Sequence, residues 1–375
     1  MKYGLLGDHA EILSGFAFKS ENFNTDGQGI PLVRIRDVVA GETSTFYNGA
    51  FEERFVVQPG DTLIGMDGDF NRALWKSAPA LLNQRVCKIT ARGDLDQRYL
   101  YHLLPGLLQV ISDRTPFVTV KHLSAKDLKE TEIPLPPLVE QKRIAAILDQ
   151  ADALRRLRWR ALDRLNTLGQ AVFHKMFGNP QINDRSWPVV PLSQLGILER
   201  GVSKHRPRND PKLLGGRHPL IQTGDVARAA DYITSHSSTY SEAGLQQSRK
   251  WRQGTLCITI AANIADTALL DFDACFPDSV VGFDSGDEAV NFFVHRWFAT
   301  VKNHLEAVAP AVAQKNINLA ILRELPVIKP DGLLIQSFFR REHEIKASKS
   351  LAQSALAQAE QLFTSLHHRA FRGEL

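Results

Sequence analysis

The sequence contains few of the residue groupings that catalyse reactions. Acids cluster in "FPDSVVGFDSGDE" (Phe276 to Glu288), but no lysine is spaced to complete a nuclease site. The twelve histidines form no HExxH motif, and the adjacent His367 and His368 would point to different faces of a helix, which makes a poor metal pair. There is no GxxxxGK[ST] phosphate loop, no glycine-rich cofactor loop and no [DNS]-P-P-[YFW] amine pocket. We therefore expect no catalytic residues and no metal site in this chain.

Hydrogen-bonding side chains in turn-rich stretches are the chemistry that remains. Arg34 and Arg36 alternate along an apparent strand, so both would project from one face of it. Asn83, Gln84 and Arg85 place two amides and a guanidinium in a row. Such groups can bind the edges of nucleic acid bases. For any one of them, a surface or turn role is an equally good interpretation.

Length and composition indicate a folded protein of several domains. The 375 residues predict two or three domains, and 43% hydrophobic with 23% charged residues is typical of a globular chain. The longest apolar runs are too short to cross a bilayer, and the N-terminus has no uninterrupted apolar segment typical of secretion. Cys257 and Cys275 could pair, but three distant cysteines favour reduced thiols and a cytoplasmic location.

The basic charge is concentrated in one segment. The net charge is +4, and residues 138–177 alone carry eight Lys and Arg against four Asp and Glu. This excess suits a nucleic acid or an acidic protein as a partner, and a solvated helix face explains it equally well.

Two long helices are expected to position the rest of the chain. Residues 138–177 lie between Pro136-Pro137 and Gly178-Asn179-Pro180, which are helix start and stop signals. Residues 333–371 contain neither glycine nor proline, and Asp331 can cap their start. The predicted heptad seams are Ile147, Ala151, Leu154, Arg158, Ala161, Leu165, Leu168 and Val172, then Ile345, Ser348, Ala352, Ala355, Ala359, Leu362 and Leu366. The matched lengths favour pairing of the two helices over separate packing on two domains.

The two remaining segments read as copies of one mixed α/β unit. "IPLVRIRDV" (Ile30 to Val38) parallels "HPLIQTGDV" (His218 to Val226), and "QPGDTLI" parallels "RQGTLCI". Lys121 stands opposite Lys315 in a third matching pair. The predicted domains are residues 1–137, 138–177, 178–330 and 331–375, in the order globule, helix, globule, helix.

The whole chain resembles the specificity (S) subunits of type I restriction–modification systems. The strongest marks are "IPLPPLVEQKRIAAILDQADAL" and "LHHRAFRGEL"; "LSGFAFKSENF", "IPLVRIRDV" and "VFHKMFG" support them in the family's order. The resemblance implies an α/β (α+β) fold with two target recognition domains and two long helices paired as an antiparallel coiled coil, in a pseudo-two-fold repeat. The loop "ERGVSKHRP" stands where the first globule has "LSGFAFKSE", so the resemblance of the second globule is weaker.

The function that this resemblance implies is recognition rather than catalysis. Each globule would read one half of a split double-stranded DNA target, while two methyltransferase subunits dock on the helices and restriction subunits join them. S-adenosylmethionine, ATP and Mg would be bound only by those partner subunits. Two other classes stay open, namely an enzyme with an unrecognised active site and a coiled-coil scaffold without DNA affinity.

Candidate contact residues follow from the motifs and their matching positions. In the first globule the DNA-binding candidates are Phe18, Lys19, Ser20, Arg34, Arg36, Asn83, Gln84, Arg85, Lys121 and His122. In the second they are Ser203, Lys204, His205, Arg206, Gln222, Thr223, Lys315, Asn316 and Asn318. The basic residues Arg155, Arg156, Arg160 and Arg164 of the first long helix, with Arg158 among them, are candidates for binding a partner subunit or the DNA backbone.

Overall fold

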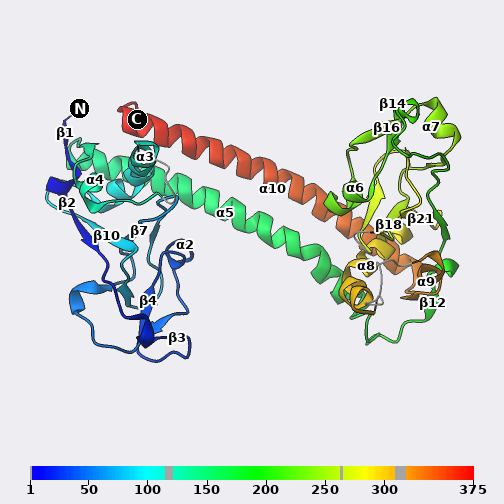
Figure 1. Cartoon of the computed structure of the whole chain (residues 1–375), viewed down its shortest axis with the longest axis horizontal. Coiled ribbons are helices and arrows are strands. Elements are labelled where there is room, and N and C mark those ends of the chain that lie inside the picture. The colour runs from blue at the N-terminus through cyan, green and yellow to red at the C-terminus, as the bar shows by residue number, and fades with distance from the viewer. Residues whose placement is uncertain (1, 115–120, 262–264, 309–317) are drawn as a thin grey trace. The chain divides into compact units, whose positions relative to one another are not determined.

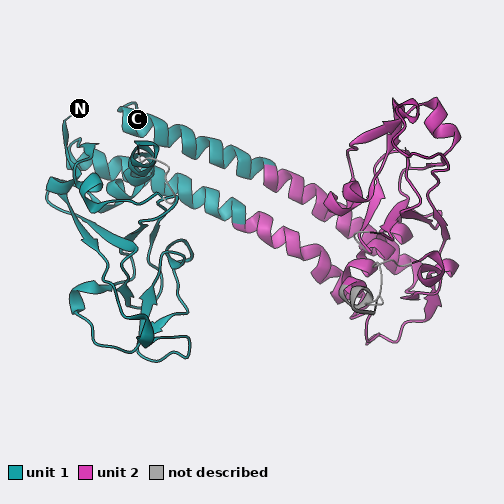
Figure 2. Ribbon diagram, viewed as in Figure 1, with its two compact units in different colours: residues 1–159, 354–375 teal, residues 160–353 magenta. Residues whose placement is uncertain are grey.

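The computed structural model describes residues 2–114, 121–261, 265–308 and 318–375. The chain divides into two compact units, residues 1–159 with 354–375 and residues 160–353 (Figure 2). Each unit contains one globular segment and a portion of both long helices, α5 (Leu138–Phe177) and α10 (Gly332–Arg372) (Figure 1). The mixed α/β character predicted for both globular segments is confirmed.

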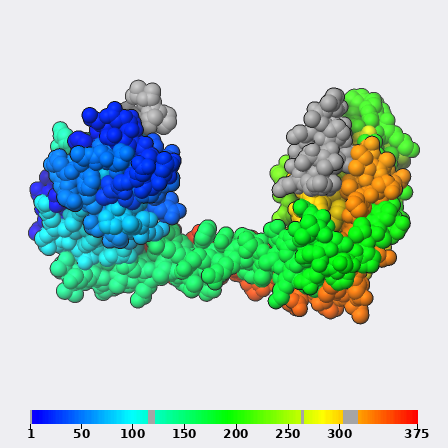
Figure 3. All heavy atoms as spheres, turned by 90° about the horizontal axis from the view of Figure 1, so that it is seen from below, coloured from blue at the N-terminus to red at the C-terminus, as the bar shows by residue number. Residues whose placement is uncertain are grey.

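The first unit is built on two small sheets and a ribbon. The antiparallel sheet has the order β2 (Ala10–Ser14), β10 (Val86–Ala91), β7 (Thr62–Gly65), β8 (Arg72–Leu74). The mixed sheet has the order β3 (Phe23–Asn24), β5 (Phe46–Tyr47), β4 (Ile30–Val33), β9 (Ala80–Leu82), β6 (Val56–Val57), with β4 parallel to β9. The ribbon pairs β1 (Tyr3–Leu5) with β11 (Glu132–Pro134). The globular part, blue to cyan in Figure 3, lies on the first half of α5.

Helices complete this unit. They are α1 (Leu6–His9), α2 (Asp37–Ala40), α3 (Gln97–Arg114) and α4 (Ala125–Lys129), with short 3-10 turns at Ser20–Asn22 and Glu53–Phe55. The core gathers around α3, whose Tyr99, Leu100 and Leu104 are fully buried.

The second unit repeats this plan. Its antiparallel sheet has the order β13 (Ile197–Arg200), β21 (Val280–Asp284), β18 (Leu256–Thr259), β19 (Thr267–Leu270), with β15 (Tyr232–Ile233) added in parallel. Its mixed sheet has the order β16 (Ser238–Tyr240), β14 (Leu214–Leu220), β20 (Ala274–Cys275), β17 (Lys250–Trp251), with β14 parallel to β20. The ribbon pairs β12 (Val189–Pro191) with β22 (Pro326–Ile328), and the helices are α6 (Thr223–Arg228), α7 (Glu242–Gln246), α8 (Glu288–Val308) and α9 (Leu319–Arg323). The internal repeat predicted from the sequence is therefore present in the strand order.

The long helices begin and end as expected. Helix α5 has the predicted bounds, and α10 exceeds the prediction by one residue at each end. Asp331 caps α10, since its Oδ1 accepts a hydrogen bond from the Leu333 amide at 2.8 Å. Both helices stop at a glycine of positive φ, Gly178 (78°) and Gly373 (75°), a conformation that glycine adopts without steric cost.

The C-terminal turn of each long helix packs on a helix of a globular segment. Phe173 and Phe177 at the end of α5 are 1% exposed and contact Phe293 of α8 with ring centroids 5.8 and 4.9 Å apart. At the end of α10, Phe371 contacts Tyr99 of α3 at 5.5 Å. The motifs "VFHKMFG" and "LHHRAFRGEL" therefore have the same structural role, because each anchors a long helix to the core of a unit.

Within each unit α5 and α10 run antiparallel. In the first unit Arg143 contacts the carbonyl of Leu375, just after α10, and Arg155 lies over the Phe363 ring. Residues later in α5 therefore contact residues earlier in the C-terminal helix, which is antiparallel packing. In the second unit Phe177 contacts Phe338 near the start of α10, while a Cβ on Gly169, earlier in α5, would meet the carboxylate of Glu342, which is further along α10.

The predicted seams are only partly right. Ala151, Ile345 and Ala359 are buried, but Leu154, Leu168, Ser348 and Leu362 are exposed. The predicted positions Ile147, Leu165, Val172, Ala352, Ala355 and Leu366 are half-buried. Buried or half-buried positions outside the predicted seams include Gln141, Ala145, Leu148, Asp152, Arg155, Leu162, Gly169 and Phe173 on α5, and Phe338, Glu342, Lys349, Leu356, Phe363 and Ala370 on α10. The globular segments cover a second face of each helix, so the apolar stripe is wider than a coiled-coil seam and its register is ambiguous in the sequence.

Candidate nucleic-acid interface

The loop after β2 is fixed by close backbone packing and by aromatic rings. A side chain at Gly15 would overlap the carbonyl oxygen of Asn83, and the Phe16 amide donates to the Leu82 carbonyl at 2.9 Å. Phe18 is 7% exposed and packs on Tyr47 with ring centroids 4.9 Å apart. Phe18 therefore anchors the loop, while the predicted contact residues Lys19 and Ser20 are exposed.

Arg34 and Arg36 do not alternate along a strand, so that prediction is wrong. Strand β4 ends at Val33, and the Asp37 carboxylate accepts a hydrogen bond from the Arg34 amide at 2.9 Å. Thr43 donates to the same oxygen at 2.9 Å. A carboxylate that accepts from the amide three residues before it makes a turn rather than a strand. Arg34 is half-buried in this turn, and the exposed Arg36 approaches Asp37 at 3.7 Å.

Parallel pairing of β4 and β9 brings two predicted contact stretches together. Val33 is paired with Leu82, and the Asn83 amide donates to the Val33 carbonyl at 3.3 Å. Arg34 and Asn83 therefore leave the sheet at the same edge. Asn83 accepts from the Gln84 amide at 2.9 Å, and Gln84 and Arg85 are exposed in the turn that leads to β10.

The loop between β7 and β8 contributes an acid that the sequence analysis missed. Asp67 lies 2.7 Å from His122 Nδ1 and 3.3 Å from Arg85 Nη1. His122 therefore joins this edge. Lys121 does not point outward, because its Nζ donates to the carbonyl and hydroxyl of Ser112 at 2.7 and 3.0 Å. We name the group Lys19, Ser20, Arg34, Arg36, Asn83, Gln84, Arg85, Asp67 and His122 the first edge.

The second unit repeats the Asp-capped turn. Strand β14 is paired in parallel with β20 at Leu220 and Cys275, and the Asp225 carboxylate accepts from the Gln222 amide at 2.8 Å. Ser237 donates to Asp225 as Thr43 donates to Asp37. Gln222 therefore occupies the position of Arg34, exposed at the end of a parallel strand, and Thr223 begins α6 half-buried.

The basic loop after β13 lies beside strands β14 and β20. A side chain at Gly201 would overlap the Phe276 carbonyl, as one at Gly15 would overlap that of Asn83. Ser203 is 6% exposed, whereas Lys204, His205 and Arg206 are exposed. His205 pairs with Asp210 at 3.1 Å, and the carbonyl of Ser203 accepts from Arg206 at 2.6 Å.

Acidic residues in the stretch Phe276 to Glu288 form ion pairs with arginines of the same unit. Asp278 pairs with Arg206 at 3.6 Å and with Arg208. Asp284 accepts two bonds from Arg252 at 2.6 and 2.7 Å, and this contact holds the pKa of its carboxyl at about 2. We name the group Lys204, His205, Arg206, Arg208, Gln222, Thr223 and Asp278 the second edge. In the described ranges, no group of three or more His, Cys, Asp or Glu could hold a metal ion.

Three predicted residues of the second globule have other outcomes. Lys315 and Asn316 lie outside the described residues. Asn318 caps α9, since its side chain accepts from the Ile321 amide at 2.9 Å.

The arginines of α5 fall into two groups. Arg155 pairs with the buried Asp152 at 2.5 Å and lies over the Phe363 ring, and Arg156 pairs with the same acid. Arg158, Arg160 and Arg164 are exposed, and none of them has an ion pair with any residue that the structure describes. Only the second group is therefore free to bind a partner without first breaking an internal contact.

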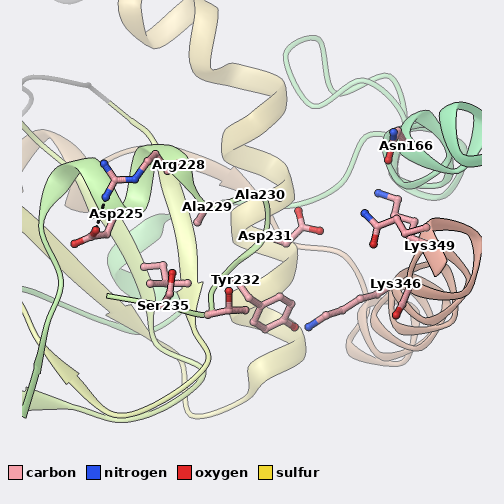
Figure 4. Close-up of a pocket in the computed structure, with 14 residues that line it drawn as sticks. Asn166, Asp225, Arg228, Ala229, Ala230, Asp231, Tyr232, Ser235, Lys346 and Lys349 are labelled. Carbon is pink, nitrogen blue, oxygen red and sulfur yellow. Dashed lines mark hydrogen bonds and ion pairs between the residues drawn. The ribbon is translucent and has the colours of Figure 1, made fainter. Parts of the chain in front are cut away.

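The second unit also contains a cavity of about 490 Å³, which is less suited to binding a ligand than the two edges are (Figure 4). It lies between the segment Asp225–Ser235 and the two long helices. Most of its charged side chains already have partners, because Arg228 pairs with Asp225 at 2.5 Å, Asp231 pairs with Arg296 at 2.9 Å, and Lys346 lies 3.8 Å from the Tyr232 ring centroid.

The comparisons with known proteins agree with one another. Residues 1–166 match the family model described as the type I restriction modification DNA specificity domain. The chain is 34% identical to the type I restriction enzyme EcoBI specificity subunit of Escherichia coli, over 98% of this chain and 84% of that protein. No helix of the described ranges is long and apolar enough to span a membrane.

Two solved structures share the fold. The S subunit of a type I restriction–modification system from M. genitalium matches with a TM-score of 0.60 at 13% identity, covering 99% of this chain and 96% of that one. A chain from a structural study of complex assembly and conformational transition in the type I R-M system matches with a TM-score of 0.59 at 17% identity, covering 100% and 98%. With its 34% identity to a curated specificity subunit over nearly its whole length, this chain belongs to the type I restriction–modification DNA specificity family.

Proposed function

We propose that this chain is the non-catalytic subunit that reads a two-part double-stranded DNA target and directs methyltransferase and restriction subunits to it. The observation that carries the proposal is the duplicated edge. In both units a parallel strand ends in an Asp-capped turn, at Asp37 and at Asp225, and presents polar side chains beside a second polar loop. Arginine and the amide side chains are the groups that hydrogen-bond base edges in the major groove.

The two edges are built alike but carry different side chains, which supports an asymmetric target. Arg34 of the first edge stands where the second has Gln222. Arginine favours guanine, whereas glutamine favours adenine. Two scaffolds of one plan with different contact groups suit two different half-sites.

The helices supply the surface for partner subunits in this proposal. Leu157 and Trp159 of α5 are 55% and 58% exposed, next to the exposed Arg158 and Arg160. Apolar side chains beside unpaired arginines are typical of protein interfaces. Since the chain contains the helical unit twice, we propose two methyltransferase subunits, with S-adenosylmethionine, ATP and Mg bound by the partners. The cytoplasm is the compartment where such an assembly meets the genome.

Selection from a randomised DNA library tests this function. The full chain, alone and with the methyltransferase subunits of its own system, is used to retain duplexes at physiological salt. We expect two short enriched sequences separated by unselected base pairs. A chain that retains DNA without sequence preference, or retains none, would instead be a scaffold. Methylation or cleavage by the chain alone would make it an enzyme.

The isolated chain should not bind S-adenosylmethionine. It has neither the glycine-rich loop nor the amine pocket that hold this cofactor and its target base. Titration calorimetry should show no saturable heat with the chain and a saturable signal with the assembled complex. Stoichiometric binding to the chain alone would overturn the assignment of the cofactor to the partners.

Reversing two of the unpaired arginines of α5 should weaken assembly. The double variant Arg160→Glu with Arg164→Glu should lower affinity for the methyltransferase, or for DNA between the half-sites, by about tenfold or more, because like charges across an interface repel. Co-purification and gel-shift titration separate these two outcomes. The control is Arg340→Glu with Arg341→Glu, which makes the same charge change at exposed positions of α10. Equal weakening by both variants would show that only net charge matters.

A further inference from the structure

We propose that Asp67 and Asp278 are specificity-determining positioning residues, each of which holds two basic side chains of its edge in fixed directions. This inference rests on the proposed function, since it assigns a role within DNA reading. Neither acid belongs to the hydrogen-bonding stretches that the sequence singles out as base readers.

Asp67 connects three segments of the first edge. Its carboxylate lies 2.7 Å from His122 Nδ1 and 3.3 Å from Arg85 Nη1. The backbone joins the same segments, because the Met66 amide donates to the Arg85 carbonyl at 2.9 Å and the Leu123 amide donates to the Met66 carbonyl at 2.7 Å. The side chains of Arg85 and His122 are each 52% exposed, so both reach solvent while one end is held.

The loop that carries Asp67 is held in an unusual conformation. Phe70 has a positive φ of 48°, which is rare for a bulky residue, yet its ring is only 2% exposed. The Gly65 amide donates to the Asn71 carbonyl at 2.7 Å and closes the loop. Backbone strain kept in place by core packing is common at functional sites. Here it fixes the position of the Asp67 carboxylate relative to the sheet.

Asp278 is the counterpart in the second edge. It follows β20, as Gln84 follows β9, and its two carboxylate oxygens pair with Arg206 and Arg208 of the basic loop. Its carbonyl also accepts from Arg200 Nε at 2.8 Å. A single acid therefore orients two basic side chains in each unit, although the acids come from different loops.

Two physical effects make such an acid useful to a DNA reader. An arginine held by a carboxylate loses less conformational freedom when it grips a base, so more of its binding free energy is available to discriminate between bases. The same carboxylate repels phosphates and lowers affinity for DNA in general. Removing the charge should therefore lower the affinity for the preferred sequence relative to other sequences. It should also raise the affinity for those other sequences.

The test compares Asp67→Asn with Asp69→Asn in the full-length chain. Asp69 is exposed in the same loop, has no ion pair with any described residue, and gives the same change of charge. The probes are duplexes that the wild-type chain enriches from a randomised library and unselected duplexes of equal length. For Asp67→Asn we expect the ratio of the two affinities to fall about tenfold. The enriched sequences should lose preference in one half-site only, and the salt dependence should steepen by about one phosphate.

The reciprocal variant Asp278→Asn should relax the other half-site and leave the first intact. Asp69→Asn should change the affinity ratio by less than about twofold, since it alters only general attraction to phosphates.

The inference is overturned if Asp67→Asn and Asp69→Asn behave alike. It is also overturned if Asp67→Asn lowers the affinity for all duplexes equally and lowers the melting temperature of the protein, which marks a structural ion pair. If Asp67→Asn does not fold, Asp278→Asn and its half-site decide the question. A wild-type chain that enriches no sequence would refute the proposed function itself.

Discussion

Replacing Arg296 by methionine should lower the free energy of unfolding of the second unit by about 3–5 kcal/mol, because it leaves buried charges without their partner. The Arg296 side chain is 18% exposed and donates to Glu342 at 2.8 Å, and it pairs with Asp231 at 2.9 Å. The Glu342 side chain is 3% exposed. Both acids would keep their desolvation cost and lose the compensating cation. Chemical denaturation followed by circular dichroism measures the change.

Two further variants identify the cause. Arg340→Met removes an exposed arginine from the same helix as Glu342 and should change stability by less than about 0.5 kcal/mol. Adding Glu342→Met to Arg296→Met should recover part of the loss, since a well-packed apolar pair often replaces a buried ion pair without penalty. If the double variant is no more stable than Arg296→Met, the loss comes from packing around the arginine stem.

The Arg296 variant should also become more sensitive to acid. Burial alone would raise the pKa of Asp231, but the hydrogen bond with His295 and the charge of Arg296 outweigh it and lower that pKa to about 2. A depressed carboxyl pKa contributes stability that is present above the unfolded value of about 4 and is lost as the pH falls toward 2. Without Arg296 the pKa of Asp231 rises, so unfolding should begin at a higher pH. An unchanged acid midpoint would show that His295 alone holds the carboxylate.

Local signals allowed the long helices to be predicted, while the packing register required the folded chain. Pro136-Pro137 and Gly178 bound α5 by backbone sterics alone, so its ends follow from the sequence. The seam did not follow, because Glu342 and Lys349 occupy seam positions of α10 where an apolar residue is expected. Glu342 is acceptable there only because Arg296, 46 residues earlier, pairs with it.

The candidate edges show the same division between local and distant information. Arg34 and Gln222 could be aligned from "RIRDV" and "QTGDV", and the same motifs contain Asp37 and Asp225, whose turns end the strands. Asp67 could not be found this way. It meets Arg85 and His122 from 18 and 55 residues away, through strand pairing that no local pattern reveals.

Replacing Arg34 by alanine should reduce affinity for the preferred sequence by about 1–3 kcal/mol and relax one half-site only. Its amide is fixed by Asp37, and no carboxylate in the described ranges pairs with its half-buried guanidinium. An arginine held by its backbone and left with free donors can bind guanine through two hydrogen bonds. Binding to duplexes with single substitutions in each half-site measures where the preference is lost.

Arg36 and Gln222 give the controls that make this result interpretable. Arg36 is two residues away, is exposed and lies 3.7 Å from Asp37, so Arg36→Ala should weaken all duplexes about equally and lower the salt slope by about one. Gln222→Ala, at the matching turn of the second unit, should relax the other half-site. If Arg34→Ala instead lowers the affinity for all duplexes equally, Arg34 contacts a phosphate, as we expect of Arg36. Base reading in the first unit would then depend on Asn83 to Arg85, which leave the sheet beside it.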